Sequence, residues 1–180
     1  MITYISLLRG INVSGQKPLP MADLKQLYES LKFKNVVTYI QSGNVIFTTD
    51  KKEIEITSMI EKAIVKKFGF EVPVMVRKVK EFENVVATNP YTKSQSVIEK
   101  RYVTFLEETP EATLNTAINK IDLSPDQFWI TGKEIFLYCE NGYGKTKLSN
   151  NFFENKLKVR ATTRNWKTVN KLIELANTLK

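Results

Sequence analysis

The chain has no histidine among its 180 residues, and this absence narrows the chemistry that it can perform. Without an imidazole there is no Ser-His or Cys-His nucleophile pair and no histidine-based metal site. The usual general base near neutral pH is also missing. Any catalysis would have to use lysine, tyrosine, a carboxylate or a cofactor, and no motif in the sequence indicates a cofactor or a metal ion.

Cysteine and long apolar stretches are also scarce. A single cysteine, Cys139, excludes an internal disulfide framework. No apolar run reaches the roughly 18 residues that a membrane-spanning helix needs. Residues 1–8 lack the basic start and the small-residue cleavage site of a signal peptide, and their pattern predicts a strand. We therefore expect a cytoplasmic protein with no membrane partner.

Positive charge exceeds negative charge, giving a formal net charge of +8, and it is concentrated toward the end of the sequence. Residues 140–180 contain nine lysine or arginine residues and three glutamates, a net charge of +6. Residues 101–139 contain three basic and six acidic residues, a net charge of −3. A basic segment of this kind attracts nucleic acid, phosphorylated ligands or acidic surfaces. The alternative is an ordinary solvated surface.

Hydrophobic periodicity predicts the element order β-α-β-β-α-β in the first half of the chain. The expected strands are 2–8, 35–40, 44–48 and 72–78, and the expected helices are 21–32 and 51–68. Asp50 and Glu53 suit a capping box that opens the second of these helices. A short helix at 80–88 follows and ends at Asn89-Pro90.

The same order of elements recurs after a polar linker at 91–99. The expected strands are 101–107, 126–131, 134–139 and 159–162, and the expected helices are 110–120, 148–157 and 165–179. We therefore predict an α+β protein of two tandem ferredoxin-like β-α-β-β-α-β halves with extra helices. The halves would be residues 1–90 and 91–180, with the final helix packing back. The alternative is one continuous mixed sheet.

Three polar clusters lie at the ends of apolar runs, where an α/β sheet commonly offers backbone N–H groups to a ligand. They are Arg9–Gly15, Gln41–Asn44 and Thr162–Trp166. Arginine suits a carboxylate or a phosphate, and the start of a helix suits an anion. With one lysine from a further loop, the candidate ligand-binding residues are Arg9, Asn12, Ser42, Asn44, Lys145, Thr163 and Arg164.

Each cluster also has an explanation that needs no ligand. An arginine can pair with an acid, glycine and asparagine suit a hairpin turn, and threonine or asparagine can cap a helix. If the clusters form one site, we expect Arg9, Asn44 and Arg164 to lie around a common concavity. Trp166 would then be mostly buried beneath it.

The loop Tyr143-Gly144-Lys145-Thr146 looks like part of a P-loop, but the sequence excludes that motif. The phosphate-binding pattern needs a glycine where Cys139 stands, and the surrounding elements do not match. Residues 141–147 then form either a flexible loop that contacts phosphate through amides and ammonium groups, or a plain strand-to-helix connection with a basic rim.

Taken together, these clusters resemble domain-of-unknown-function family 1697, whose members are small bacterial proteins. The resemblance spans nearly the whole chain and implies one shared architecture. It implies no established reaction, so no catalytic role passes to any residue. The loop Ser14-Gly15-Gln16 departs from the Gly-Gly usual in the family. The matching stretches are Leu8–Val13, Leu19–Met21, Thr38–Val45, Asn89-Pro90, Lys147-Leu148 and Ala161–Thr168.

Three functions remain open. The first is a binding protein for an anionic ligand, with nucleic acid slightly favoured over a phosphorylated small molecule because ferredoxin-like sheets bind single strands through aromatic side chains. The second is an enzyme that acts on a small anionic substrate between the halves, with Tyr39 or Lys145 moving protons. The third is a structural or regulatory partner protein that uses a sheet edge or a helix face.

Overall fold

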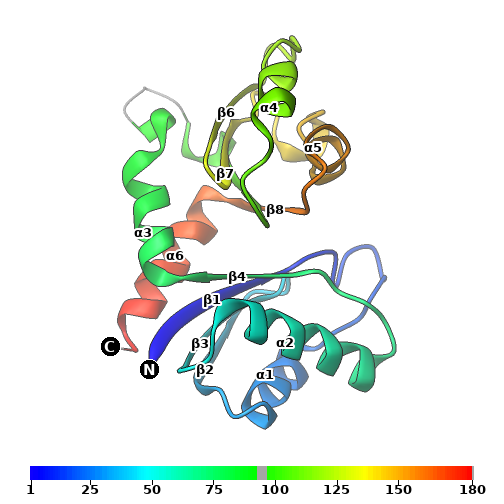
Figure 1. Ribbon diagram of the computed structural model, residues 1–180, viewed down its shortest axis with the longest axis vertical. Helices are drawn as coiled ribbons and strands as arrows, with labels where there is room; N and C mark the ends of the chain where they lie inside the picture. Colours follow the sequence, from blue (N-terminus) through cyan, green and yellow to red (C-terminus); the bar gives the residue numbers. More distant parts are fainter. Residues whose placement is uncertain (93–96, 180) are drawn as a thin grey trace. The chain divides into compact units, whose positions relative to one another are not determined.

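The computed structural model describes residues 1–92 and 97–179 and shows an α+β protein with two four-stranded antiparallel sheets (Figure 1). Contacts divide the chain into two compact units. Unit 1 comprises Met1–Asn84 and the end of the chain from Lys171, and unit 2 comprises Val85–Asn170. Four residues of the expected linker, 93–96, lie outside the described residues.

Unit 1 contains the first sheet, whose strands run in the order β2-β3-β1-β4 with every neighbouring pair antiparallel. Helices α1 and α2 cover one face of this sheet (Figure 1). The elements are β1 (Ile2–Leu8), α1 (Met21–Ser30), β2 (Lys34–Tyr39), β3 (Asn44–Thr49), α2 (Glu53–Phe68) and β4 (Val74–Lys78). Each lies where the sequence predicted it, to within a few residues.

Unit 2 contains the second sheet, in the order β6-β7-β5-β8, again with antiparallel neighbours. Helix α3 (Val79–Thr88) leads into this unit from unit 1, and two short 3-10 turns follow it. The remaining elements are β5 (Arg101–Leu106), α4 (Ala112–Ile118), β6 (Gln127–Thr131), β7 (Glu134–Tyr138), α5 (Asn150–Leu157), β8 (Ala161–Asn165) and α6 (Trp166–Asn177), of which α6 passes into unit 1 at Lys171.

The core of unit 1 is aromatic where the sheet meets its helices. Phe47 stacks on Phe33 with ring centroids 4.7 Å apart, and the edge of the Tyr28 ring meets Phe47 at 5.3 Å. The Tyr28 hydroxyl lies 2.8 Å from the Ser6 hydroxyl, so the buried phenol keeps a hydrogen-bond partner. Burying rings of this size contributes on the order of 2–3 kcal/mol each.

The central strands of each sheet are buried on the opposite face as well. Strand residues alternate between faces, so Ile5 and Leu7 point away from the face that carries Tyr4 and Leu8. Both are fully buried, although they lie outside the core formed with α1 and α2. In unit 2 the residues on the corresponding face, Val103, Phe105 and Phe136, are also fully buried.

Two details of the sequence-based prediction were wrong. No capping box opens α2, because its N-cap residue is Lys52 without a side-chain bond. Asp50 instead pairs with the amino group of Met1 at 2.9 Å. The last strand was expected at 159–162 but lies at Ala161–Asn165, so Thr162, Thr163 and Arg164 form part of β8. The expected capping by asparagine is confirmed, because the Asn165 side-chain oxygen accepts a hydrogen bond from the Thr168 amide at 2.7 Å.

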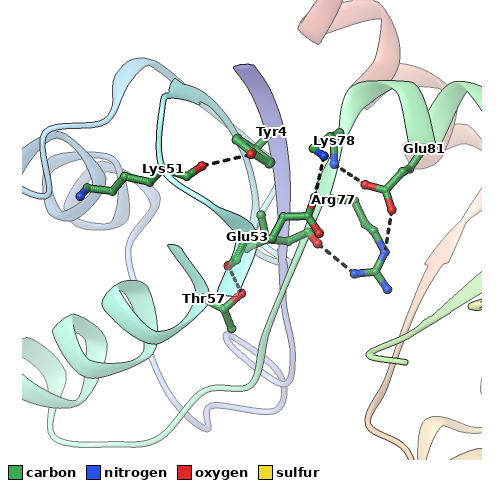
Figure 2. Close-up of polar contacts among 8 residues, drawn as sticks. Tyr4, Lys51, Glu53, Thr57, Arg77, Lys78 and Glu81 are labelled. Carbon is green, nitrogen blue, oxygen red and sulfur yellow. Dashed lines mark hydrogen bonds and ion pairs between the residues drawn. The ribbon is translucent and has the colours of Figure 1, made fainter. Parts of the chain in front are cut away.

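A network of charges ties the end of β4 to the helices beside it, and Figure 2 shows these contacts. The Lys78 ammonium lies 3.6 Å from a Glu53 carboxylate oxygen, and the Lys78 amide donates to Glu81 at 2.8 Å. The Arg77 guanidinium lies 3.7 Å from Glu81 and donates to the Val76 carbonyl at 2.9 Å. These bonds orient the chain where strand β4 passes directly into α3.

As Arg77 does in β4, an arginine near the end of β8 also donates to the carbonyl of the preceding residue. Arg164 is the penultimate residue of that strand, as Arg77 is of β4, and its guanidinium donates to the Thr163 carbonyl at 2.9 Å. Both arginines are largely buried, at 9% and 5% exposure. Each strand is followed at once by a helix, so the repeated order of elements includes a repeated side-chain arrangement.

Replacing Gly43 with alanine should destabilise the protein by roughly 2–4 kcal/mol. Its φ of +78° disfavours any side chain, and an added Cβ would lie 2.6 Å from the Ile11 Cδ1 atom and 2.7 Å from the Leu8 Cβ atom. Urea unfolding measures the loss. Gly144→Ala is the matched control, because nothing lies within 4 Å of a Cβ there. Equal stability of the two variants would contradict the tight turn.

Alkaline pH tests the burial of Tyr28. Burial raises its folded-state pKa above the ordinary value, and the Ser6 hydrogen bond only partly opposes this. The stability that depends on the neutral phenol is therefore complete below about pH 10 and is lost as pH rises further. Between about pH 9 and pH 11, wild type should lose about 1.4 kcal/mol more of its free energy of unfolding than Tyr28→Phe. Parallel pH dependences in urea unfolding would refute this.

Candidate functional site

Asn12 clamps the loop after β1 to the hairpin turn between β2 and β3. Its Nδ2 atom donates to the carbonyls of Leu19 and Gln41, both at 2.9 Å, and its Oδ1 atom accepts the Leu19 amide at 2.8 Å. Both N–H groups of the Asn12 side-chain amide therefore donate hydrogen bonds, and its oxygen accepts one. The contacts explain Asn12 as a structural clamp, and they bring the first two polar clusters of the sequence together.

The turn that Asn12 holds has a strained backbone. Ile40 has a φ of +50°, which β-branched residues rarely adopt, at a cost of order 1–3 kcal/mol. The Asn44 side chain secures the same turn, because its Nδ2 atom donates to the Tyr39 carbonyl and the Ser42 hydroxyl, both at 3.0 Å. Asn44 is fully buried, so its amide is occupied within the turn.

Arg9 follows β1 at the edge of the first sheet. Its backbone N–H donates to the Pro73 carbonyl at 3.0 Å, which fastens the loop to the start of β4. The residue is half-buried. It lies in unit 1 with the Asn12 clamp, at the end of β1, which is a central strand of the first sheet.

Thr163 and Arg164 lie on β8 in unit 2. The Thr163 hydroxyl donates to the Asn150 side chain at 2.7 Å and lies 2.7 Å from the Thr104 hydroxyl, so it joins β5, β8 and α5. Burial lowers the pKa of the Arg164 guanidinium to about 10, so the charge persists at neutral pH. Both side chains thus take part in the packing of the second sheet.

Lys145 is exposed on the loop between β7 and α5, with Lys147 exposed two residues further on. Thr146 between them donates its hydroxyl proton to Asp126 at 2.5 Å and accepts the Leu148 amide at 3.1 Å. The second Asp126 oxygen accepts the Glu140 amide at 2.8 Å. One carboxylate therefore fixes a loop that holds two lysines in solvent.

A cavity of about 410 Å³ lies in unit 2 beside this loop, and the sequence analysis missed it. Its walls are Pro90 and Tyr91, residues of the 119–126 connection that includes Asp122 and Asp126, and the edge-strand segment from Gln127 to Trp129. The Trp129 side chain is 59% exposed. A sequence signal existed: Phe128 and Ile130 alternate toward the core, which leaves this tryptophan on the outward side of β6.

Three ionisable side chains of unit 2 have pKa values shifted so that each keeps its usual protonation state at neutral pH. Burial raises the pKa of the Cys139 thiol to about 11, although a hydrogen bond with Thr146 opposes the shift. Burial likewise raises the pKa of Tyr91 to about 12. Hydrogen bonds from the Ser124 side chain and amide lower the pKa of Asp122. At neutral pH the thiol and phenol are neutral and the carboxylate is charged.

The candidate residues thus form two groups. Arg9, Asn12, Ser42 and Asn44 belong to unit 1, while Lys145, Thr163 and Arg164 belong to unit 2. Within unit 1 the Asn12–Gln41 bond joins the first two clusters. Trp166 is 5% exposed, which confirms its predicted burial. A common concavity for Arg9, Asn44 and Arg164 stays a prediction.

The fold and these clusters define an α+β protein of two four-stranded antiparallel sheets with polar loops at their edges. The chain belongs to the family described as Protein of unknown function (DUF1697), whose model matches residues 1–136. This confirms the resemblance found in the sequence, and no function is established for the family by that description. No curated protein matches the chain.

A solved structure shares the fold. It is that of the conserved bacterial protein SP0830 from Streptococcus pneumoniae, with a TM-score of 0.79 at 24% sequence identity. The match covers 98% of this chain and 99% of the other. Within residues 1–92 and 97–179, no helix is both long enough and apolar enough to cross a membrane.

Changing Asn12 to aspartate should destabilise the protein by about 2–4 kcal/mol, because two carbonyls lose their donor and face a carboxylate instead. The free energy of unfolding in urea is the measurement. Asn141→Asp is a matched control with the same change of charge at an exposed position. A loss at position 12 no larger than the loss at position 141 would show that Asn12 is not a clamp.

Proposed function

We propose that the protein is a non-catalytic binding protein for an anionic ligand, with a phosphorylated small molecule favoured over nucleic acid. The observation that carries this proposal is the pair of exposed lysines, Lys145 and Lys147, on a loop fixed by the Thr146–Asp126 hydrogen bond. A fixed loop loses less conformational entropy when it binds than a mobile one. The net charge of +6 over residues 140–180 adds long-range attraction for anions.

The preference for a small ligand rests on the sheets. Single-stranded nucleic acid is often bound by aromatic side chains on an open sheet face. Here Ile5 and Leu7 in one sheet, and Val103 and Phe105 in the other, are fully buried on the face that such binding would use. Loop lysines then remain as phosphate contacts, and they carry no base recognition of their own.

We also propose that each half of the chain, residues 1–90 and residues 91–180, has a ferredoxin-like fold. Two observations support it. Unit 1 combines the element order β-α-β-β-α-β with the strand order β2-β3-β1-β4, and unit 2 repeats both. The arginine at the penultimate position of β4 and β8 repeats as well. The final helix would then pack back toward the first half, as its residues from Lys171 are grouped with unit 1.

An enzymatic function has less support. A catalytic acid or base usually has its pKa moved toward neutrality by its surroundings. The Cys139 and Tyr91 side chains are moved away from it, to about 11 and about 12. Neither group is therefore poised as a nucleophile or a base at neutral pH, and binding is the better account of the charged loops.

Replacing Lys145 and Lys147 together with glutamine should weaken anion binding by about 10-fold at low salt, because two charge-assisted contacts are lost. Fluorescence anisotropy of a labelled adenine nucleotide and of a labelled oligonucleotide of about 20 nucleotides measures the affinity. For the oligonucleotide, the slope of log affinity against log salt should fall by about one for each lysine.

Lys62→Gln with Lys66→Gln is the matched control, because both lysines are exposed on α2 and the change in net charge is the same. The control should bind like wild type. If both double variants weaken binding equally, net charge alone attracts the anion and no site exists at the loop. If wild type binds neither probe at low salt, the proposed function fails.

A further inference from the structure

The cavity in unit 2 has an electrostatic character opposite to that of the protein as a whole. The chain carries a net charge of +8, yet two aspartates, Asp122 and Asp126, line this cavity. No lysine or arginine is among the lining residues that the structure describes. Residues 101–139, which supply most of the wall, carry a net charge of −3. The charged groups on the cavity wall are therefore negative and favour a cation over an anion.

Both carboxylates are held in place before any ligand arrives. Asp126 accepts the Glu140 amide with one oxygen and the Thr146 hydroxyl with the other. Asp122 accepts the Ser124 amide at 3.0 Å and its hydroxyl at 2.6 Å. A carboxylate oxygen has two lone-pair sites, so each aspartate keeps acceptor capacity for a further donor. Groups positioned in this way lose little entropy on binding.

Aromatic rings complete the wall. Trp129 exposes 59% of its surface on the outward side of an edge strand, which is unusual for so large an apolar side chain. Tyr91 and Phe128 line the same cavity. The face of an aromatic ring attracts a cation, and tryptophan does so most strongly. Rings beside carboxylates combine an apolar surface with two fixed negative charges.

We propose that this cavity is a binding site for an organic cation, in which an ammonium or guanidinium group meets Asp122 and Asp126 while its apolar body stacks on Trp129. The volume of about 410 Å³ lies within the range of roughly 300–1,000 Å³ that small-molecule sites occupy. This site is separate from the anion-binding loop and takes ligands of the opposite charge. Two sources supply the chemistry, a free amine or a basic side chain of a peptide.

The test uses four probes that share a phenyl ring and differ in the group that it carries: benzylammonium, benzyltrimethylammonium, benzyl alcohol and benzoate. Two-dimensional NMR of the ¹⁵N-labelled full chain follows the indole N–H of each tryptophan. Trp166 is 5% exposed and outside the cavity, so it serves as an internal reference. Both cations should shift the Trp129 signal and bind at least about fivefold more tightly than the alcohol. Benzoate should bind more weakly still.

Variants assign the contacts. Asp122→Asn should weaken benzylammonium binding by about fivefold, because a charge-assisted contact becomes neutral. Glu108→Gln makes the same charge change at an exposed position outside the cavity and should bind like wild type. Trp129→Leu should weaken binding by at least about fivefold, whereas Trp129→Phe, which keeps an aromatic face, should stay within about threefold. The backbone amide of Gln127 reports binding in these last two variants.

Equal affinity for benzylammonium, benzyl alcohol and benzoate would overturn the proposal, as would equal losses in Asp122→Asn and Glu108→Gln. A capped arginine-containing tetrapeptide distinguishes the two sources. If the tetrapeptide binds more tightly than benzylammonium, a polypeptide side chain is the source, and the reverse order indicates a free amine. If the Trp129 signal moves with none of these probes at concentrations of roughly 10 mM, the cavity does not bind organic cations.

Discussion

The structure depends on the burial of the sheet face that α1 and α2 leave uncovered, and of its counterpart in unit 2. A four-stranded antiparallel sheet commonly has one face packed on helices and the other facing solvent, where a ligand can bind. Here the central strands carry fully buried apolar residues on the second face, among them Ile5, Leu7, Phe105 and Phe136. Each contributes on the order of 1.5–3 kcal/mol to stability. Opening that face to a ligand would cost several such contributions.

This burial leaves the loops and sheet edges as places for recognition. In unit 1 the polar side chains of these loops bond to the loops themselves. The amides of Asn12 and Asn44 donate to neighbouring carbonyls and hold a turn in which Ile40 has a strained backbone conformation. Unit 2 differs, since its edge strand β6 exposes Trp129 and its β7–α5 loop exposes Lys145. The two units thus repeat an architecture but differ in the chemistry that they present.

Hydrophobic periodicity predicted every α-helix and strand, although not the short 3-10 turns, because alternation and helical spacing are local properties of the sequence. It could not show what the polar residues do. Asn12 and Ser42 looked like ligand contacts, and only the fold reveals that Gln41, 29 positions away, uses the Asn12 amide. The cavity was missed for the same reason. Its walls come from Tyr91, Asp126 and Trp129, which the chain brings together over nearly 40 positions.

Asp126 connects the two sites proposed for unit 2. One of its oxygens accepts the Thr146 hydroxyl and so fixes the loop with Lys145, while the same carboxylate lines the cavity. A cation in the cavity would interact with the Asp126 carboxylate that accepts the Thr146 hydrogen bond. An anion on Lys145 and Lys147 would bind the loop that this hydrogen bond holds in place. If both proposed sites bind, binding at one would therefore change the free energy of binding at the other through this shared carboxylate. Thermodynamic linkage requires that effect to be equal in both directions, so a ligand pair of opposite charge would report the coupling from either end.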